Sequence, residues 1–437
     1  MGTRLRALFD GLRGSETGKA AGLAGAMIIN NLVALITSVV FARVLSDYGA
    51  LAALVSYLTI LTVAGQAIQV ATAREGVLGH LGEGEQLLAT LERWAKALAV
   101  FTVAATVVSI LLRQPIADLV GVKHQAWAAA AGIPAGCVYL ALCTLRGALQ
   151  AIGDYRSVGI SLIGEQVVRL VVGAILAEAG LGIGGAYLGS LVAYVAMSGY
   201  CVFCLYARVA GPSYHRWRVG SAPAGVIGFG AHVWAAAVPI AALAVVQLLQ
   251  NVDLITAKHQ FSNTVASSYA VAAVAAKVLI WVAMGAAFYL VPETSRRHSE
   301  GQDTRPVLMR SLGIIAVCAI PCLLIYAVAA HPLLVIVFGK KRAIASSSLL
   351  PLGAAFTVLA ATYLAVQYML ALKQRWFLLA LAAVAVVEPI LLLHAPKHPA
   401  AFAGVVLLVQ AIGAVVAFGI ALLRRPPVPP LAASTSV

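Results

Sequence analysis

Five ionisable side chains interrupt the long apolar stretches of this sequence, and their chemistry needs explaining first: Asp253, Lys277, Glu388, and the pair Glu165 and Arg169. An unpaired charge inside a bilayer costs at least about 2.5–3.5 kcal/mol on insertion scales. Such groups are therefore expected to face one another, a water-filled cavity or a charged ligand. The chemistry that they predict is recognition of charge in a medium of low polarity.

Each of these charges can be satisfied in more than one way. Glu165 and Arg169 are four residues apart on one helical face, in the order that favours an ion pair, so they could simply neutralise each other. Lys277 has no carboxylate four residues away, and it needs a partner on another helix, a water-filled cavity or an anionic ligand; we favour the cavity. Glu388 precedes Pro389, which predicts a kink, although local backbone or water could satisfy this carboxylate.

Polar amides accompany the charges in two places. Single amides in apolar helices usually join helices together. Here they concentrate in the first two apolar runs of each half of the chain, which predicts a water-accessible central passage. The lining that we expect consists of Asn30, Asn31, Gln66, Gln69, Gln247 and Asn251, with Gln250 on the same face as Gln247.

The elements that must position these residues are membrane-spanning helices. Apolar residues make up 62% of the 437 and charged residues 11%, which is typical of an integral membrane protein. A spanning helix needs roughly 20 apolar residues. We predict an all-α protein with about twelve such helices, at 20–40, 48–70, 95–112, 126–145, 158–176, 183–207, 233–255, 269–290, 312–330, 349–372, 376–393 and 400–423.

The net charge of +14 reflects orientation in the membrane rather than nucleic-acid binding. Most Lys and Arg residues fall on one side of the predicted helices, and the positive-inside rule makes that side cytoplasmic. Both termini are then cytoplasmic, and anionic membrane lipids are the expected partners of these charges. The assigned residues include Arg4, Arg6, Arg13, Arg208, Arg216, Arg218, Arg296, Arg297, Arg424 and Arg425.

A weak internal repeat predicts two lobes. A shift of 221 residues places Asn30 on Asn251 and Tyr48 on Tyr269, and the segments 115–121 and 332–339 match at a similar offset. With six helices in each half, the copies enter the membrane in the same sense, which implies a pseudo-twofold axis along the membrane normal. Chance similarity between apolar helices is the alternative. We expect lobes at 1–220 and 221–425 and a disordered cytoplasmic tail at 426–437.

Motifs for catalysis or nucleotide binding are weak. The glycine pattern at 180–185 lacks a βαβ context and is better explained by a turn followed by close helix packing at Gly185 and Gly189. The segment 14–20 resembles a P-loop but is one residue short. The six cysteines fall in predicted helices, where the Cys201–Cys204 spacing has no second pair to complete a metal site. We expect no enzyme activity, cofactor or bound metal.

Several segments together resemble bacterial polysaccharide exporters of the O-antigen flippase type, which share a superfamily with multidrug and toxic-compound extruders and lipid II flippases. The first hairpin is similar at 41–49, Gln69 and 73–74. The segment 145–155 followed by Glu165, Arg169 and Leu170 is similar to that family's fourth and fifth helices. Further similarities lie at Asn251, Asp253, Tyr269, Lys277, 331–332 and 338–339.

The resemblance implies export of a polyprenyl-pyrophosphate-linked oligosaccharide across the bacterial cytoplasmic (inner) membrane by two rocking lobes. Glycosyltransferases and a glycan polymerase would be its partners. The resemblance implies a cationic cavity of Arg74, Arg146, Arg169 and Lys277 for the pyrophosphate, with Glu165, Asp253 or Glu388 coupling transport to protons or sodium. A cation-coupled exporter of drugs or metabolites is the alternative. A membrane-embedded polymerase or ligase would need larger external loops than this sequence provides.

Overall fold

The structure is a computed structural model, and it describes residues 16–209 and 228–423. The predicted lobe boundary at 220/221, the tail 426–437 and the P-loop-like segment up to residue 15 lie outside the described residues. So do the predicted cytoplasmic residues Arg4, Arg6, Arg13, Arg216, Arg218, Arg424 and Arg425.

The described residues fold into helices without any strand, as predicted. Ten helical segments are long and apolar enough to cross a membrane. One of them, Tyr155–Val209, contains two successive helices, and the apolar helix Phe377–Leu393 is shorter than the others. The protein is therefore an all-α, multi-pass membrane protein, and the number of twelve spanning helices stays a prediction.

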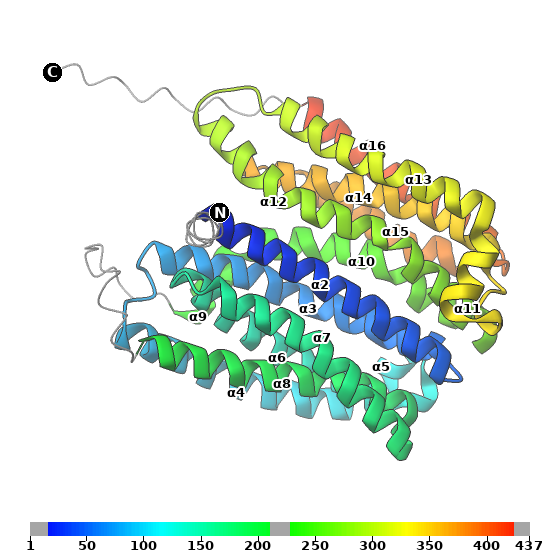
Figure 1. Ribbon diagram of the computed structural model, residues 1–437, viewed down its shortest axis with the longest axis horizontal. Coiled ribbons are helices and arrows are strands. Elements are labelled where there is room, and N and C mark those ends of the chain that lie inside the picture. Colours follow the sequence, from blue (N-terminus) through cyan, green and yellow to red (C-terminus); the bar gives the residue numbers. More distant parts are fainter. Residues whose placement is uncertain (1–15, 210–227, 424–437) are drawn as a thin grey trace, which may run out of the picture. The chain divides into compact units, whose positions relative to one another are not determined.

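The chain divides into two compact units, Met1–Leu243 and Ala244–Val437. Figure 1 shows the helices of unit 1 in blue to green. The helical elements of unit 1 are α2 (Glu16–Val44), α3 (Tyr48–Val77), α4 (Glu85–Leu111), α5 (Arg113–Val120), η1 (Lys123–Gln125), α6 (Ala126–Ala151), α7 (Tyr155–Leu176), η2 (Ala177–Leu181), α8 (Gly182–Val209), α9 (Phe229–Ala235) and the start of α10 (Ala237–Gln260).

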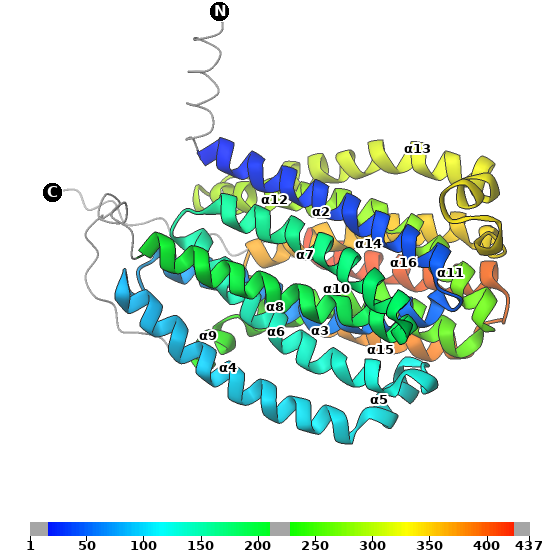
Figure 2. The same cartoon turned by 60° about the horizontal axis from the view of Figure 1, so that its bottom comes forward.

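Helix α6 lies at the centre of unit 1, because it packs against α3, α4 and α8, while α7 packs against α2 and α8. Small residues allow the closest approaches. A Cβ on Gly147 of α6 would lie 2.5 Å from the carbonyl oxygen of Gln69 on α3. Figure 2 shows α4 running along the edge of unit 1 and continuing into α5.

Helices α7 and α8 confirm the predicted glycine packing. The chain turns at η2, where Gly180 has a φ of 98°. A Cβ on Gly189 would lie 2.7 Å from the Cα atom of Gly173, and a Cβ on Gly185 would lie 2.6 Å from the backbone of Leu176. The glycine run at 180–185 is therefore a helix-to-helix turn with close packing after it.

Unit 2 is built around α14, which packs against α11, α12, α13 and α16. Figure 1 shows this unit in light green to red. Proline interrupts α13, whose backbone leaves the helical region at Ala329, three residues before Pro332. Unit 2 begins with the main part of α10. The elements that follow are α11 (Asn263–Ala276), α12 (Val278–Ser299), α13 (Arg305–Phe338), η4 (Lys340–Arg342), η5 (Ser346–Ser348), α14 (Leu349–Ala371), α15 (Phe377–Leu393) and α16 (Pro399–Leu423).

The helix boundaries differ at the first predicted repeat match and correspond at the second. Tyr48 begins α3, whereas Tyr269 lies inside α11, so an offset of 221 residues does not superpose the two helix corners. The second match agrees in element order. Helix α5 and the last part of α13 both end at a glycine with positive φ, 80° at Gly121 and 94° at Gly339, and a 3-10 turn follows each.

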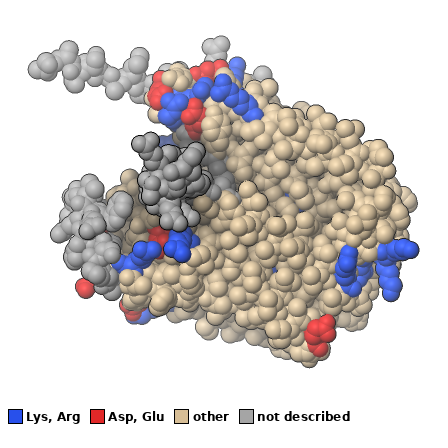
Figure 3. All heavy atoms as spheres, in the orientation of Figure 1, with Lys and Arg blue, Asp and Glu red and all other residues tan. Residues whose placement is uncertain are grey.

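Charged side chains gather at helix ends. On the face shown in Figure 3, blue and red spheres cluster over the corner of α12 and α13, and broad surfaces of the helices are uncharged. At this corner Arg296 bonds Glu293 and Glu300 at 2.8 Å, and Arg297 also bonds Glu293 at 2.8 Å. Ionic side chains at this end of unit 2 therefore neutralise one another.

Candidate functional site

The corner between α6 and α7 sets the register of the first buried cluster. Gly153 turns the chain with a φ of 78°. Asp154 then caps α7, accepting bonds from the backbone nitrogen of Ser157 at 3.2 Å and from its hydroxyl at 2.8 Å. Arg208 at the end of α8 donates to the same carboxylate at 3.0 Å. This corner fixes how α7 and α8 present their polar residues to α6.

Arg146 of α6 forms a fully buried ion pair with Glu165 of α7. The Nη2–Oε2 distance is 3.0 Å, and the two side chains are 0% and 7% exposed. Arg146 also donates from Nε to the hydroxyl of Ser161 at 2.7 Å and from Nη2 to its carbonyl oxygen at 2.8 Å. Its remaining nitrogen, Nη1, is buried without a hydrogen-bond partner. The pair therefore keeps one unused donor.

Arg169 lies on α7, the helix of Glu165, but it bonds a different residue. Its Nη2 donates to the hydroxyl of Tyr194 on α8 at 2.8 Å, and the guanidinium carbon lies 5.7 Å from the centre of that ring. The Tyr194 ring in turn packs against Tyr139 of α6, with 4.8 Å between centroids. The Nε of Arg169 is buried and has no partner. A second donor in this cluster is thus unused.

In the structure, Glu165 does not pair with Arg169, the neighbour that the sequence suggested. Glu165 pairs with Arg146 on the preceding helix, and Arg169 bonds a tyrosine. We call Arg146, Glu165 and Arg169, with Ser161, Tyr139 and Tyr194, the α6–α8 cluster. With all three ionisable groups charged, the cluster carries a formal charge of +1.

Lys277 of unit 2 lies at the boundary between two helices. The predicted span 269–290 lies within one candidate membrane span, Asn263–Ser299, in which α11 ends at Ala276 and α12 begins at Val278. Lys277 joins the two helices with near-helical dihedrals, a φ of −65° and a ψ of −13°. The Nζ atom of Lys277 donates to Oδ1 of Asn251 at 3.0 Å and lies 5.5 Å from the centre of the Phe356 ring. The amide and the aromatic ring are both neutral. Among the described residues, no carboxylate lies within ion-pair distance of Lys277.

Asp253 is fully buried two residues beyond Asn251 on α10. Its Oδ2 accepts a bond from the Tyr269 hydroxyl at 3.3 Å, and its Oδ1 is buried without a partner. Lys277 is an electrostatic neighbour of this carboxylate but lies beyond ion-pair distance. The carboxylate therefore keeps a free oxygen in a buried setting.

Glu388 of α15 is also fully buried. Both of its oxygens lie 3.2 Å from Nε2 of Gln410 on α16, and this nitrogen also donates to the carbonyl oxygen of Leu249 at 3.0 Å. Asp253 is close enough to act on Glu388 electrostatically. We call Asp253, Lys277 and Glu388, with Asn251, Tyr269 and Gln410, the α10–α16 cluster. Its formal charge is −1 with all three groups ionised.

Apart from Asn251, the other predicted residues lie outside these two clusters. Arg74 is exposed in the last turn of α3. In the predicted passage lining, Gln247 and Asn251 are buried, and the part-exposed members are Asn30, Asn31, Gln66 and Gln69. Asn30 donates to Asn31 at 3.3 Å. A shared passage for these amides stays a prediction.

Sequence reasoning missed the neutral partners of the charges. Tyr194, Ser161 and Gln410 each bond a predicted residue, and none was singled out. Gln410 left a signal, because it is the one polar amide in the apolar helix Pro399–Leu423. Tyr194 and Ser161 left none, because single hydroxyls are common in spanning helices.

Chemically, the two clusters suit opposite charges. The α6–α8 cluster has an excess of guanidinium groups with unused donors, an arrangement that suits phosphate or carboxylate oxygens. The α10–α16 cluster has two buried carboxyl groups, one with a free oxygen, which suits a proton or a small cation.

Comparison with solved structures shows the fold. A lipid II flippase, MurJ in an inward closed conformation, matches with a TM-score of 0.68 and 14% identity over 91% of this chain and 87% of that one. An inward-facing multidrug resistance MATE family transporter of the MOP superfamily matches with a TM-score of 0.68 and 13% identity, over 91% and 94%. The MATE multidrug transporter DinF-BH in complex with R6G matches with a TM-score of 0.65 and 13% identity, over 93% and 94%.

No protein-family model matches the chain. A search of curated proteins also found no match. The chain thus shares its fold with this lipid II flippase and with these MATE transporters.

Proposed function

We propose that this protein exports a polyprenyl-pyrophosphate-linked oligosaccharide across the bacterial cytoplasmic membrane, for assembly of a cell-surface polysaccharide. The observation that carries the proposal is the α6–α8 cluster, where Arg146 and Arg169 lie on candidate membrane-spanning helices and each keeps a buried nitrogen without a partner. A pyrophosphate that enters a low-dielectric region loses hydration, and fixed guanidinium donors replace part of it. The lipid II flippase among the structural neighbours acts on a lipid-linked cargo.

Transport would proceed by alternating access, in which the site faces first one side of the membrane and then the other. The α10–α16 cluster would supply the coupling. A proton or sodium ion bound at Asp253 and Glu388 adds one positive charge, which takes the formal charge of the α10–α16 cluster from −1 to 0, so its arrival and departure change the charge of unit 2. Glu165 is the weaker candidate for coupling because Arg146 already neutralises it.

Lys277 and Arg74 would have separate roles in this scheme. Lys277 is buried and its contacts with Asn251 and Phe356 are to neutral groups, so it is a buried cation of unit 2 that remains available to an anionic cargo. Arg74, exposed at the end of α3, would meet the pyrophosphate before or after the buried groups do. Glycosyltransferases would make the cargo, and a glycan polymerase would use it.

A second candidate is a cation-coupled exporter of drugs or metabolites. The observation that favours it is the formal charge of −1 on the α10–α16 cluster, which suits a cationic compound as well as a coupling ion. The multidrug transporters among the structural neighbours have the same fold. This candidate predicts that removal of the protein changes drug resistance and leaves surface polysaccharide intact.

The test compares Arg169→Ala and Lys277→Ala with two controls. Arg156 lies exposed on α7, the helix of Arg169, and Arg310 lies exposed on α13 in unit 2. We expect Arg169→Ala and Lys277→Ala to leave glycolipid on the cytoplasmic leaflet at normal protein levels, with no effect of Arg156→Ala or Arg310→Ala. Surface glycan at wild-type levels in both cluster variants would rule out the proposed role of these cations. Ion-dependent drug efflux from vesicles would support the second candidate.

A further inference from the structure

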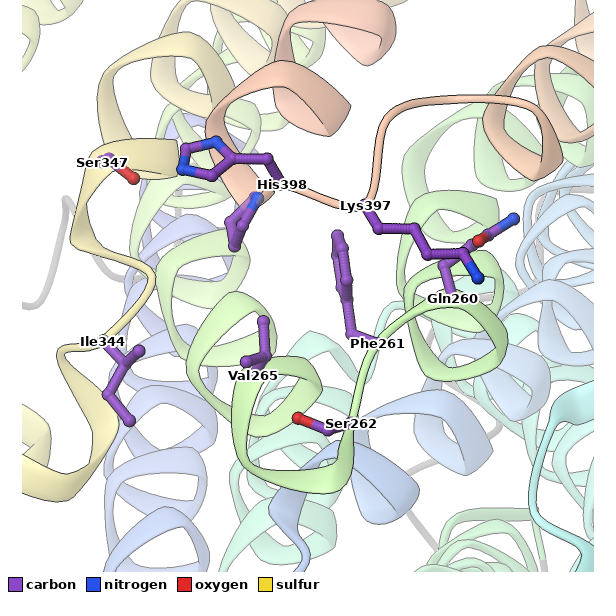
Figure 4. A pocket seen from close by; sticks show the side chains of 9 residues that line it. Gln260, Phe261, Ser262, Val265, Ile344, Ser347, Lys397 and His398 are labelled. Atoms are coloured by element: carbon purple, nitrogen blue, oxygen red, sulfur yellow. The ribbon is translucent and has the colours of Figure 1, made fainter.

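A pocket that neither cluster contains lies at one end of unit 2. It is an open pocket of about 440 Å³, lined by residues from the end of α10, the start of α11, the segment 344–347 and the turn before α16. Pockets that hold small ligands typically measure about 300–1,000 Å³. Figure 4 shows Phe261 near the middle of the pocket, with His398 extending toward Ser347 and Lys397 extending to the other side.

The residues that line this pocket include the basic side chains Lys397 and His398 and no acidic one. The segments 254–268, 327–352 and 389–403 meet here, since η5 packs against both α11 and α16, and η4 also packs against α11. They contain no Asp or Glu. Their basic residues are Lys258, His259, His331, Lys340, Lys341, Arg342, His394, Lys397 and His398.

This composition differs from that of the other end of unit 2. At the α12–α13 corner, Glu293 and Glu300 pair with two arginines. At the pocket, Lys397 and His398 are exposed, whereas Asp253 and Glu388, which lie just outside the three segments, are fully buried. A concave surface concentrates the field of the charges that line it. An anion is therefore the ligand that this end of the unit attracts.

Polar groups at the pocket can bond an anion directly. Lys397 and His398 are exposed and line it, and they are joined there by the hydroxyls of Ser262 and Ser347. Ser262 precedes the first turn of α11, yet its side chain makes no capping bond, so its hydroxyl is available. Gln260 bonds the carbonyl oxygen of Leu393, which holds the end of α10 against the end of α15.

The floor of the pocket is rigid and aromatic. Phe261 packs against Phe402 with 5.1 Å between ring centroids, and Tyr269 packs against Phe402 at 5.3 Å. Phe261, Phe402 and Tyr269 are all buried. The polar groups are therefore mounted on a packed support, which lowers the conformational cost of binding.

We propose that this pocket is a binding site for a phosphate-bearing headgroup, with Lys397 and His398 as its cationic contacts and Ser262 and Ser347 as hydroxyl donors. Under the predicted orientation it opens at the outer surface, where such a headgroup comes from a membrane phospholipid or from an exported pyrophosphate-linked lipid. Binding to the purified protein needs no transport, so the proposal stands or falls independently of the proposed function.

Three probes test it with the full-length purified protein at low ionic strength: inorganic pyrophosphate, nanodiscs with and without phosphatidylglycerol, and a polyprenyl pyrophosphate. We expect wild-type protein to bind pyrophosphate, and Lys397→Gln with His398→Gln to weaken that binding about tenfold or more. Preferential retention of phosphatidylglycerol would identify a phospholipid headgroup. Tighter binding of polyprenyl pyrophosphate than of either other probe would identify a lipid-linked cargo.

Two control variants separate the pocket from the general field. Lys341→Gln removes an exposed charge from the same end outside the pocket lining, and Arg375→Gln removes an exposed charge from the turn that joins α14 and α15. We expect both to bind all probes like wild type. Equal loss in Lys341→Gln and in the double variant, or no binding of any probe by wild type, would overturn the proposal. Thermal unfolding of each variant verifies that it is folded.

Discussion

The α6–α8 cluster of unit 1 and the α10–α16 cluster of unit 2 solve the problem of buried charge in opposite ways. In unit 1, Arg146 and Glu165 neutralise each other directly at 3.0 Å. In unit 2, Lys277 bonds an amide and Glu388 bonds an amide, although Asp253 is an electrostatic neighbour of both. Direct pairing fixes a charge in place, whereas bonds to neutral groups leave it free to change state or partner.

This difference suggests a division of labour. A direct pair resists change, because separating the two charges exposes each to a low-dielectric surrounding. A carboxyl group bonded to an amide can gain a proton or a cation without losing its neighbour. The α6–α8 cluster is therefore expected to contribute chiefly to structure and anion recognition, and the α10–α16 cluster to respond to ions.

Removal of Arg146 should have the largest effect on stability. Arg146→Ala leaves Glu165 buried without its cation, and breaking a buried pair from one side costs about 3–5 kcal/mol. Thermal or denaturant unfolding of the purified protein measures this loss. The double variant with Glu165→Gln should recover part of it, and Arg156→Ala on the surface of α7 should unfold like wild type. Wild-type stability of Arg146→Ala would show that the pair is not what holds α6 to α7.

The sequence predicted the class of this fold from composition alone, because repeated apolar runs of membrane-crossing length are rare in soluble proteins. It also located the buried charges, since their cost makes each one conspicuous. It could not predict that Glu165 pairs with Arg146 rather than Arg169, because residues that share a helical face need not point to each other once another helix packs against that face. Nor could it show the helix boundary at Lys277, where α11 ends without a proline or glycine.

Neutralising Glu388 should separate function from stability. Glu388→Gln keeps an oxygen that can accept the bond from Gln410, so we expect unfolding within about 1 kcal/mol of wild type. Transport should fall at least about tenfold and lose its dependence on the coupling ion, because the charge that the ion neutralises is gone. Reconstituted vesicles with imposed proton or sodium gradients measure this. Asp253→Asn should behave alike, and full ion dependence in both variants would place coupling elsewhere.

Lys277 should matter less for stability than Arg146 does. Lys277→Met removes one hydrogen bond to Asn251 but also removes the cost of burying an ammonium group, so the net change should be within about 1 kcal/mol. Transport of an anionic cargo should fall, and transport of a cationic drug should not. Unfolding and transport of the same preparation provide both readouts. A loss of several kcal/mol would mean that Lys277, like Arg146, is a structural cation.

The smallest expected effect on stability is that of His232 in unit 1. It matters for the comparison of the two clusters, because a pH effect must be shown not to come from unit 1 before it is assigned to the carboxyl groups of unit 2. His232 lies on α9, outside the candidate membrane spans. Its Nε2 lies 3.0 Å from the hydroxyl of Thr72 on α3, and its ring stacks on Trp94 of α4 with 4.8 Å between centroids. Burial lowers the pKa of His232 from its usual value of 6.5, and Glu75 opposes that shift.

Because the unfolded chain binds a proton at His232 more readily than the folded chain does, stability should rise with pH through this range. Lowering the pH from about 7.5 to about 5.5 should therefore lower the free energy of unfolding, and with it the midpoint of thermal unfolding. His232→Phe keeps the stacking on Trp94 and removes the titration, so the difference between the two pH profiles isolates this group. Identical profiles would show that the pH response originates entirely in other groups, among which the carboxyl groups of unit 2 would be the first to test.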